Sequence, residues 1–206
     1  MGAEHRGWGL GRTALWMGVA FAAGCLPSAR IVTRALSRGE ITEIGDGKPG
    51  AANVSRNLGK GAGAAVLALD AFKAFTPAAA ARLAGAPQSV VTLVAVTPMV
   101  SHILVVGGRG AACALGAAFA IDAKAMTVTL IPLVGGSKLG YHPQAVLVSA
   151  FTIASLHAAF RRRPDAALGF LVPAIMVGAR LAGSRTAPRP TSFGVWWNRL
   201  TVDRDA

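Results

Sequence analysis

The sequence predicts an all-α integral membrane protein, folded as a polytopic bundle of about seven transmembrane or broken helices. Hydrophobic residues make up 53% of the 206 residues and charged residues only 15%, which is more apolar than an ordinary soluble domain. The apolar residues form separate runs, interrupted at intervals by 25 glycines and 11 prolines. Both residue types are frequent in transmembrane helices that pack closely. We therefore expect a single integral membrane domain over residues 1–206.

The first half of the chain contains three apolar runs and one polar segment. The run at residues 13–29 has no charged residue and exceeds the core of a signal peptide in length, so we expect a retained first helix. Residues 30–60 are glycine-rich and carry six basic residues, against two before the first run. This charge difference predicts a functional loop on the cytoplasmic side. Further spans are predicted at residues 61–83 and 89–106.

The second half contains four further apolar runs, at residues 111–121, 125–134, 145–160 and 166–179. The first two are short and are equally consistent with one broken helix. Seven crossings place the three arginines at 161–163 outside, against the charge rule, so the number of spans stays open by one. The basic tail at residues 184–206 contains two adjacent tryptophans, which is typical of a segment at the membrane interface.

The charge balance points to lipid rather than to nucleic acid. Lysine and arginine exceed aspartate and glutamate by 12, but the basic residues lie between apolar runs, where they fix topology and contact anionic headgroups. No basic surface with interleaved aromatic residues is visible, so we predict the bilayer as a partner and no nucleic acid. Cys25 and Cys113 lie in apolar runs and form no CxxC motif. This excludes a disulfide framework or a zinc site, and we predict no metal.

One glycine-rich segment, residues 40–63, has the composition of an anion-binding cradle. Its sequence is EITEIGDGKPGAANVSRNLGKGAG. Glycines let backbone amides approach phosphate oxygens, Asn53 adds a neutral donor, and the planar guanidinium of Arg56 suits a phosphate. A charged cytoplasmic turn with glycines is the structural alternative.

The sequence GGRG at residues 107–110 is a second candidate of the same kind. A helix that begins just after it presents free amides and a positive dipole end to an anion, and Arg109 supplies a countercharge. The alternative is an arginine that anchors the membrane boundary. Because two spans separate the two glycine-rich segments, both are expected on the same side of the bilayer.

Two further sites carry ionisable side chains within apolar runs. Asp70 and Lys73 lie three residues apart and therefore on one helix face. They are candidates for an acid and base or for the relay of a small anion transporter, and a structural ion pair is the alternative. His102 ends a span near GGRG, where it is a candidate base or phosphate ligand, or a helix-end histidine with a backbone partner.

These segments resemble, over residues 24–112, the acyl-phosphate:glycerol-3-phosphate acyltransferase family of bacterial membranes, the PlsY type. The residues in register with the family's first loop are Glu40, Ile41, Glu43, Gly45, Gly47, Gly50, Ala51, Asn53, Val54, Arg56, Leu58 and Gly59. Its second block corresponds to Leu69, Asp70, Lys73 and Pro77, and its third to Ser101, His102 and Gly107 to Gly110. The family's Gly-Ser-Ile-Pro at the end of the first helix corresponds to Gly24, Cys25, Leu26 and Pro27.

The chain departs from this pattern at positions that bear on chemistry. The family's substrate-contacting serine, loop asparagine, threonine and first-loop arginine are replaced by Asp46, Lys48, Ala52 and Thr42. The third block is about four residues short, and the family's C-terminal His-x-x-Asn-Ile motif has no counterpart that we identify. An aspartate that faces a phosphate dianion repels it. A divergent member is therefore expected, with a catalytically inactive scaffold or lipid-binding relative as the alternative.

The resemblance implies a fold, an activity and a site. The activity is transfer of a fatty acyl group from acyl phosphate to the 1-hydroxyl of glycerol 3-phosphate in the bacterial inner membrane, without a cofactor, acyl-CoA or a metal. The candidate catalytic residues are Asp46 and His102. The candidate substrate-binding residues are Gly47, Lys48, Gly50, Asn53, Arg56, Lys73, Gly107, Gly108, Arg109 and Gly110. The oligomeric state is not implied.

Overall fold

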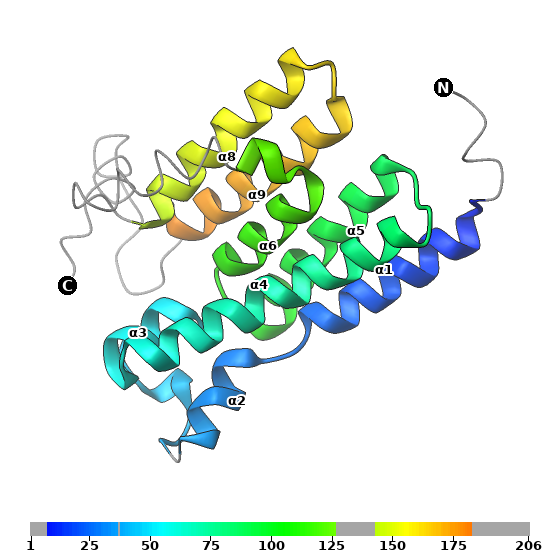
Figure 1. Ribbon diagram of the computed structural model, residues 1–206. Coiled ribbons are helices and arrows are strands. Elements are labelled where there is room, and N and C mark those ends of the chain that lie inside the picture. Colours follow the sequence, from blue (N-terminus) through cyan, green and yellow to red (C-terminus); the bar gives the residue numbers. More distant parts are fainter. Residues whose placement is uncertain (1–7, 37, 127–142, 183–206) are drawn as a thin grey trace. The chain divides into compact units, whose positions relative to one another are not determined.

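The computed structural model describes residues 8–36, 38–126 and 143–182, and these residues form helices and their connections (Figure 1). The chain divides into two compact units, Met1–Ile121 and Asp122–Ala206. The first unit contains all of the candidate site residues. The predicted all-helical class is confirmed.

The first predicted helix, residues 13–29, is in fact two helices. Helix α1 spans Leu10–Gly24 and helix α2 spans Ser28–Ala35. Pro27 separates them, because its ring fixes φ and removes the backbone N–H that a continuous helix needs. Gly24 ends α1 against helix α5, Gln88–Ser101, and a Cβ added there would lie 2.4 Å from the carbonyl oxygen of Pro98.

The segment predicted as a loop, residues 30–60, is largely helical, which corrects that expectation. Besides α2 it contains a 3₁₀ turn η1, Ile41–Glu43, and helix α3, Ala51–Leu58. The reason is a small apolar core that the polar composition of the segment obscures. Its buried members are Ala29, Ile41, Val54 and Val66. Burying these side chains against the start of helix α4, Lys60–Leu83, stabilises short helices that would be marginal alone.

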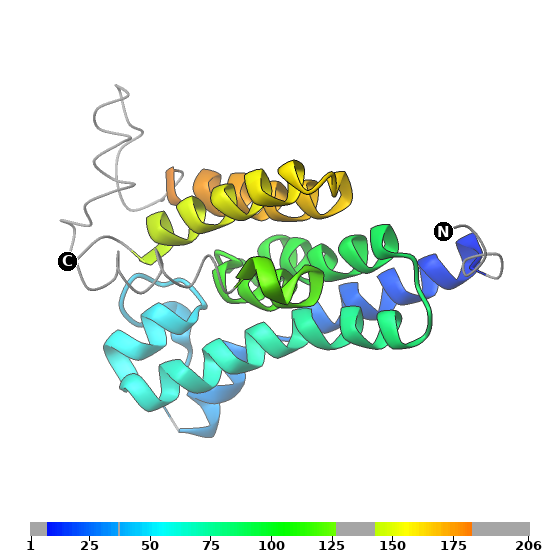
Figure 2. The ribbon, with the colours of Figure 1, turned by 45° about the horizontal axis from the view of Figure 1, so that its top comes forward.

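Three long elements form the remainder of the first unit. Helix α4 spans Lys60–Leu83, and helix α5 spans Gln88–Ser101 and continues as a π-helical turn η2, His102–Val106. Helix α6 spans Ala111–Ile121. These bounds agree with the predicted spans to within one residue. Helices α4 and α6 lie side by side in both ribbon views (Figures 1 and 2).

Close backbone contact explains why α4 and α6 pack so tightly. A Cβ added to Gly116 of α6 would lie 2.0 Å from the carbonyl oxygen of Ala71 in α4. Glycine at this position lets the two backbones approach, as small residues do between membrane helices. At the far end, the guanidinium of Arg82 and the amide of Gln88 donate to the carbonyl of Ile121, where α6 ends.

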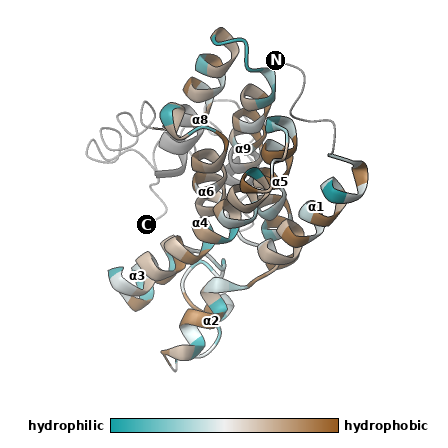
Figure 3. Ribbon diagram, turned by 45° about the vertical axis from the view of Figure 1, so that its right-hand side comes forward, coloured by the Kyte–Doolittle hydropathy of each residue, from teal (hydrophilic) through white to brown (hydrophobic). Residues whose placement is uncertain are grey.

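The helices have the length and surface of membrane-spanning elements. Among the described residues, three helical stretches are long and apolar enough to cross a bilayer: Leu10–Ala35, Lys60–Leu83 and Gln88–Val106. Shorter apolar helices cover Ala111–Ile121, Phe151–Phe160 and Pro164–Met176. Large apolar side chains such as Leu15, Phe72 and Leu104 are exposed, and hydrophobic residues extend along the helices (Figure 3). Exposed apolar surface of this extent fits lipid rather than water, and the protein is an integral membrane protein.

The second unit contains a helical hairpin. Helix α8 spans Pro143–Phe160 and helix α9 spans Pro164–Ala182, where spans were predicted at 145–160 and 166–179. The Ser155 hydroxyl donates to the Ala167 carbonyl at 2.9 Å and ties the two helices together. Most of the predicted run at 125–134 and the whole tail at 184–206 lie outside the described residues.

Candidate functional site

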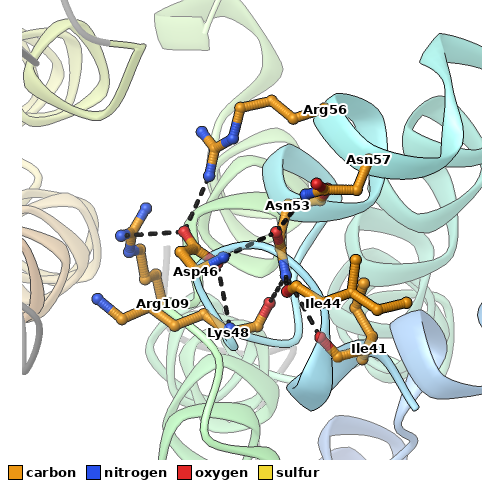
Figure 4. A network of polar contacts seen from close by, with 8 residues as sticks. All are labelled: Ile41, Ile44, Asp46, Lys48, Asn53, Arg56, Asn57 and Arg109. Carbon is orange, nitrogen blue, oxygen red and sulfur yellow. Dashed lines mark hydrogen bonds and ion pairs between the residues drawn. The ribbon is translucent and has the colours of Figure 1, made fainter. Parts of the chain in front are cut away.

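Two arginines from distant segments meet at the carboxylate of Asp46. Its Oδ2 atom lies 2.8 Å from a terminal nitrogen of Arg56, in α3, and 3.6 Å from one of Arg109, in the turn before α6 (Figure 4). The predicted convergence of the two glycine-rich segments at one end of the helices is therefore correct. Figure 4 also shows the side chain of Lys48 extending past Asp46 on the side of Arg109. The site is cationic with one anionic group inside it.

A tight turn fixes the carboxylate of Asp46. Gly45 and Gly47, on either side, have φ of 61° and 68°, a region that favours glycine. A Cβ on Gly45 would also lie 2.3 Å from side-chain atoms of Asn53 and of Asn57. Within the turn, the backbone N–H of Lys48 donates to Oδ1 of Asp46 at 3.1 Å. The glycines serve the geometry of this turn.

Asn53 is buried and its amide braces the same turn. The amide nitrogen donates to three backbone carbonyls, those of Ile44 at 2.9 Å, Lys48 at 3.2 Å and Ile41 at 3.4 Å. The amide oxygen accepts from Asn57 at 2.8 Å and from the N–H of Asp46 at 3.3 Å. A substrate contact by Asn53 therefore stays a prediction, and the observed contacts make it a positioning residue. Sequence reasoning missed Asn57, whose only signal was its spacing of four residues from Asn53.

The GGRG segment is a compact turn that leads into helix α6, as predicted. Gly107 ends the π-helical turn in a left-handed conformation, and its N–H donates to the His102 carbonyl at 3.1 Å. Gly110 has φ of 78°, and its carbonyl accepts the N–H of Ala114 at 2.8 Å. A Cβ on Gly108 would lie 2.1 Å from Nε2 of His102. The turn that carries Arg109 is therefore packed directly on the His102 ring.

A buried polar cluster lies below this turn. The ammonium of Lys73 lies 2.8 Å from Oδ1 of Asp70 and 2.9 Å from Nδ1 of His102, and it donates to the Leu26 carbonyl at 2.7 Å. Asp70 and Lys73 thus form the ion pair that their spacing predicted. The cluster joins α4 to the break after α1 and to the end of α5. Direct substrate contact by Lys73 and catalysis by His102 stay predictions.

The same cluster contains the one group among the described residues with the spacing of metal ligands. Ligand atoms of Asp70, His102 and Cys113 lie within 4.8 Å of one another. The Lys73 ammonium contacts two of these three residues. A cation placed there would be repelled by this charge at close range. The arrangement therefore favours a neutralised internal ion pair over a metal site.

The two remaining glycines of the candidate set differ in their surroundings. A Cβ on Gly47 would lie 3.1 Å from the Thr42 carbonyl oxygen, whereas one on Gly50 would meet nothing within 4 Å. Gly50 is the residue before α3 and has an extended backbone. The conformation therefore requires glycine at Gly47 and leaves open space at Gly50.

Comparison with known proteins identifies a matching family model and several relatives of this chain. The family model described as glycerol-3-phosphate acyltransferase matches residues 14–184. A glycerol-3-phosphate acyltransferase of Geobacter sulfurreducens is 30% identical over 165 residues, which cover 77% of this chain and 84% of the relative. A glycerol-3-phosphate acyltransferase of Endomicrobium trichonymphae is 36% identical over 112 residues, which cover 52% of this chain and 56% of that relative. For this and several other relatives, the matched part is about half of their length.

The fold has a counterpart among solved structures. The crystal structure of PlsY (YgiH), an integral membrane glycerol 3-phosphate acyltransferase, in its glycerol 3-phosphate form, matches with a TM-score of 0.73. The match has 24% identity and covers 82% of this chain and 88% of that one. The lysophosphatidic acid form matches with a TM-score of 0.71. The helical fold, the membrane character and the extent of the family match agree, and the chain belongs to the glycerol-3-phosphate acyltransferase family.

Proposed function

We propose that this protein transfers a fatty acyl group from acyl phosphate to the 1-hydroxyl of glycerol 3-phosphate. The product is 1-acylglycerol 3-phosphate, a precursor of membrane phospholipids, and the proposed location is the bacterial inner membrane with the arginine site at its cytoplasmic face. The observation that carries the proposal is the meeting of Arg56 and Arg109 on one anionic group. Membership of the acyltransferase family supports the reaction type.

The proposed reaction requires the protein mainly to neutralise the charge of the two substrates and to position them. Both substrates carry phosphate, and a guanidinium binds phosphate oxygens in a planar, permanently charged geometry. Arg56 and Arg109 would neutralise the phosphate of glycerol 3-phosphate and orient its hydroxyl toward the acyl carbon. The N–H groups at the start of α6 lie next to Arg109 and favour a second anion there. The hydroxyl oxygen bonds to the acyl carbon as the bond between that carbon and the phosphate oxygen breaks. The leaving phosphate takes the electron pair of the broken bond and ends with the hydroxyl proton, so the products are the ester and hydrogen phosphate.

The proposal predicts that loss of either arginine abolishes transfer without affecting insertion into the membrane. Purified Arg56→Ala and Arg109→Ala are assayed with radiolabelled glycerol 3-phosphate and palmitoyl phosphate. Arg38→Ala is the matched control, because Arg38 is exposed in the same segment. Full activity of either site variant would refute its assignment.

The carboxylate between the two arginines favours a second candidate function. In it, the protein is a catalytically inactive relative that binds lipid or acts as a scaffold. The observation behind it is that Asp46 already neutralises part of the charge that a phosphate needs. The same assay separates the candidates, since an inactive relative gives no lysophosphatidate above a control without protein.

A further inference from the structure

Asp46 places a carboxylate where the two arginines would hold a phosphate. One oxygen, Oδ2, contacts both guanidinium groups, and the other accepts the N–H of Lys48 (Figure 4). We propose that Asp46 is an internal competitor of the substrate phosphate and determines how tightly the site binds a dianion. This inference rests on the proposed function, because it concerns the same arginine pair.

The carboxylate is held in place by the chain itself. The residues on both sides of Asp46 are glycines with positive φ, and the backbone N–H of Asp46 is tied to Asn53. These contacts fix the backbone of Asp46, and the N–H of Lys48 holds Oδ1 of its carboxylate. A ligand must therefore displace a carboxylate that the protein holds in place. A mobile acidic side chain on the surface would move aside more easily.

The charges of the three groups determine the direction of the effect. Two guanidinium charges and one carboxylate charge leave a net charge of +1, and loss of the carboxylate charge raises it to +2. A phosphate dianion near Asp46 loses attraction to the arginines and meets direct repulsion. Solvent limits the size of the effect, because the Arg56 side chain is 50% exposed, whereas those of Arg109 and Asp46 are only 21% and 23% exposed. A change of roughly tenfold in affinity is therefore expected rather than one of several thousandfold.

The substitution Asp46→Asn removes the negative charge and keeps the shape of the side chain. The amide is isosteric and its oxygen still accepts the N–H of Lys48, so the turn keeps that hydrogen bond. Glu43→Gln is the matched control, because it removes the same charge from an exposed residue of the same segment. Asp46→Ser provides a second variant if the asparagine variant does not fold.

The test measures both catalysis and binding in detergent micelles. For Asp46→Asn we expect the KM and the calorimetric Kd for glycerol 3-phosphate to fall about tenfold, and their dependence on salt to steepen. Glu43→Gln should leave both unchanged. A structural role alone would not tighten binding or change its salt dependence. An unchanged or higher Kd in a folded Asp46 variant would overturn the inference.

The measurements distinguish failure of the proposed reaction from failure of the competitor role of Asp46. If neither wild type nor Asp46→Asn forms lysophosphatidate while the variant binds glycerol 3-phosphate about tenfold more tightly, the proposed reaction is wrong and the competitor role stands. If the wild type is active and the variant binds no better, the reaction stands and the competitor role is wrong.

Discussion

The Nζ atom of Lys73 lies 2.9 Å from Nδ1 of His102, and both side chains are buried. A charged lysine can only donate, so the contact assigns the acceptor nitrogen to Nδ1 and the ring proton to Nε2. Nε2 faces Gly108, in the turn that carries Arg109. A continuous set of contacts therefore runs from the ion pair in α4 to one of the two arginines of the site.

Replacement of Lys73 by methionine should strongly destabilise the protein. It leaves the buried Asp70 carboxylate without its cationic partner and removes one of the two donors to the Leu26 carbonyl. Uncompensated buried charges of this kind cost about 3–5 kcal/mol. Thermal unfolding in detergent, followed by circular dichroism, measures the loss. Lys60→Met is the control at the exposed start of the same helix. Equal melting temperatures for both variants would contradict this role.

The double variant Asp70→Asn, Lys73→Met should recover part of the lost stability. It removes the uncompensated charge, although polar groups stay buried there. A double variant no more stable than Lys73→Met would show that the ion pair is not the source of the effect.

Gly108→Ala should reduce acyl transfer by roughly tenfold or more, since displacement of a binding group by about 1 Å can have effects of this size. The added Cβ would lie 2.1 Å from Nε2 of His102. The turn must then move away from the buried ring, and Arg109 moves with it. Initial rates at several glycerol 3-phosphate concentrations measure the loss. Gly61→Ala is the control, because its Cβ would meet nothing within 4 Å. Normal kinetics for Gly108→Ala would show that the turn tolerates displacement.

Asn53→Ala should weaken glycerol 3-phosphate binding because it loosens the contact between the turn and helix α3. Its loss removes the side-chain donor to the carbonyls of Ile44 and Lys48, at a cost of about 1–3 kcal/mol, and loosens the turn on helix α3, which carries Arg56. Limited proteolysis should show faster cleavage within residues 40–50. Thr42→Ala, an exposed change in the same turn, should leave the cleavage rate unaltered. A weakened binding constant without faster cleavage would instead favour direct contact with substrate.

Gly116→Ala should lower stability by about 1–3 kcal/mol, the usual cost of overpacking. The methyl group would collide with the Ala71 carbonyl oxygen, which is backbone and cannot rotate away. The melting temperature measures the change. Gly18→Ala, in open space on α1, should leave it unchanged or raise it slightly, because alanine is the better helix former. Similar melting of both variants would mean that α4 and α6 separate without cost.

The sequence predicts the long helices well because their signal is local. The bounds of α4, of α5 with its π-helical turn and of α6 follow from apolar runs between glycines and charges. The sequence does not predict helices α2 and α3 because they depend on tertiary burial: Ala29 of α2 and Val54 of α3 become core residues only in the cluster that includes Val66 of α4. The break at Pro27 was visible in the sequence, but its hydropathy does not distinguish it from the run around it.

At the site, the sequence predicts which residues gather but not what each one contacts. The charges of Arg56 and Arg109 and the glycines around them predict convergence, which the structure confirms. The hydrogen bonds from Asn53 to backbone carbonyls depend on the path of the turn, which no local sequence pattern specifies. The position of Asp46 between the arginines likewise depends on the packing of both α3 and α6 against α4.

The interruption between α1 and α2 links two distant parts of the chain. The Leu26 carbonyl is available to Lys73 because Pro27 prevents the helix from continuing. A chain in which residues 25–28 formed an unbroken helix would direct that carbonyl along the helix axis and deprive the amine of its acceptor. The costs of changes at Pro27 and at Lys73 should therefore not add in full, because both remove the same hydrogen bond.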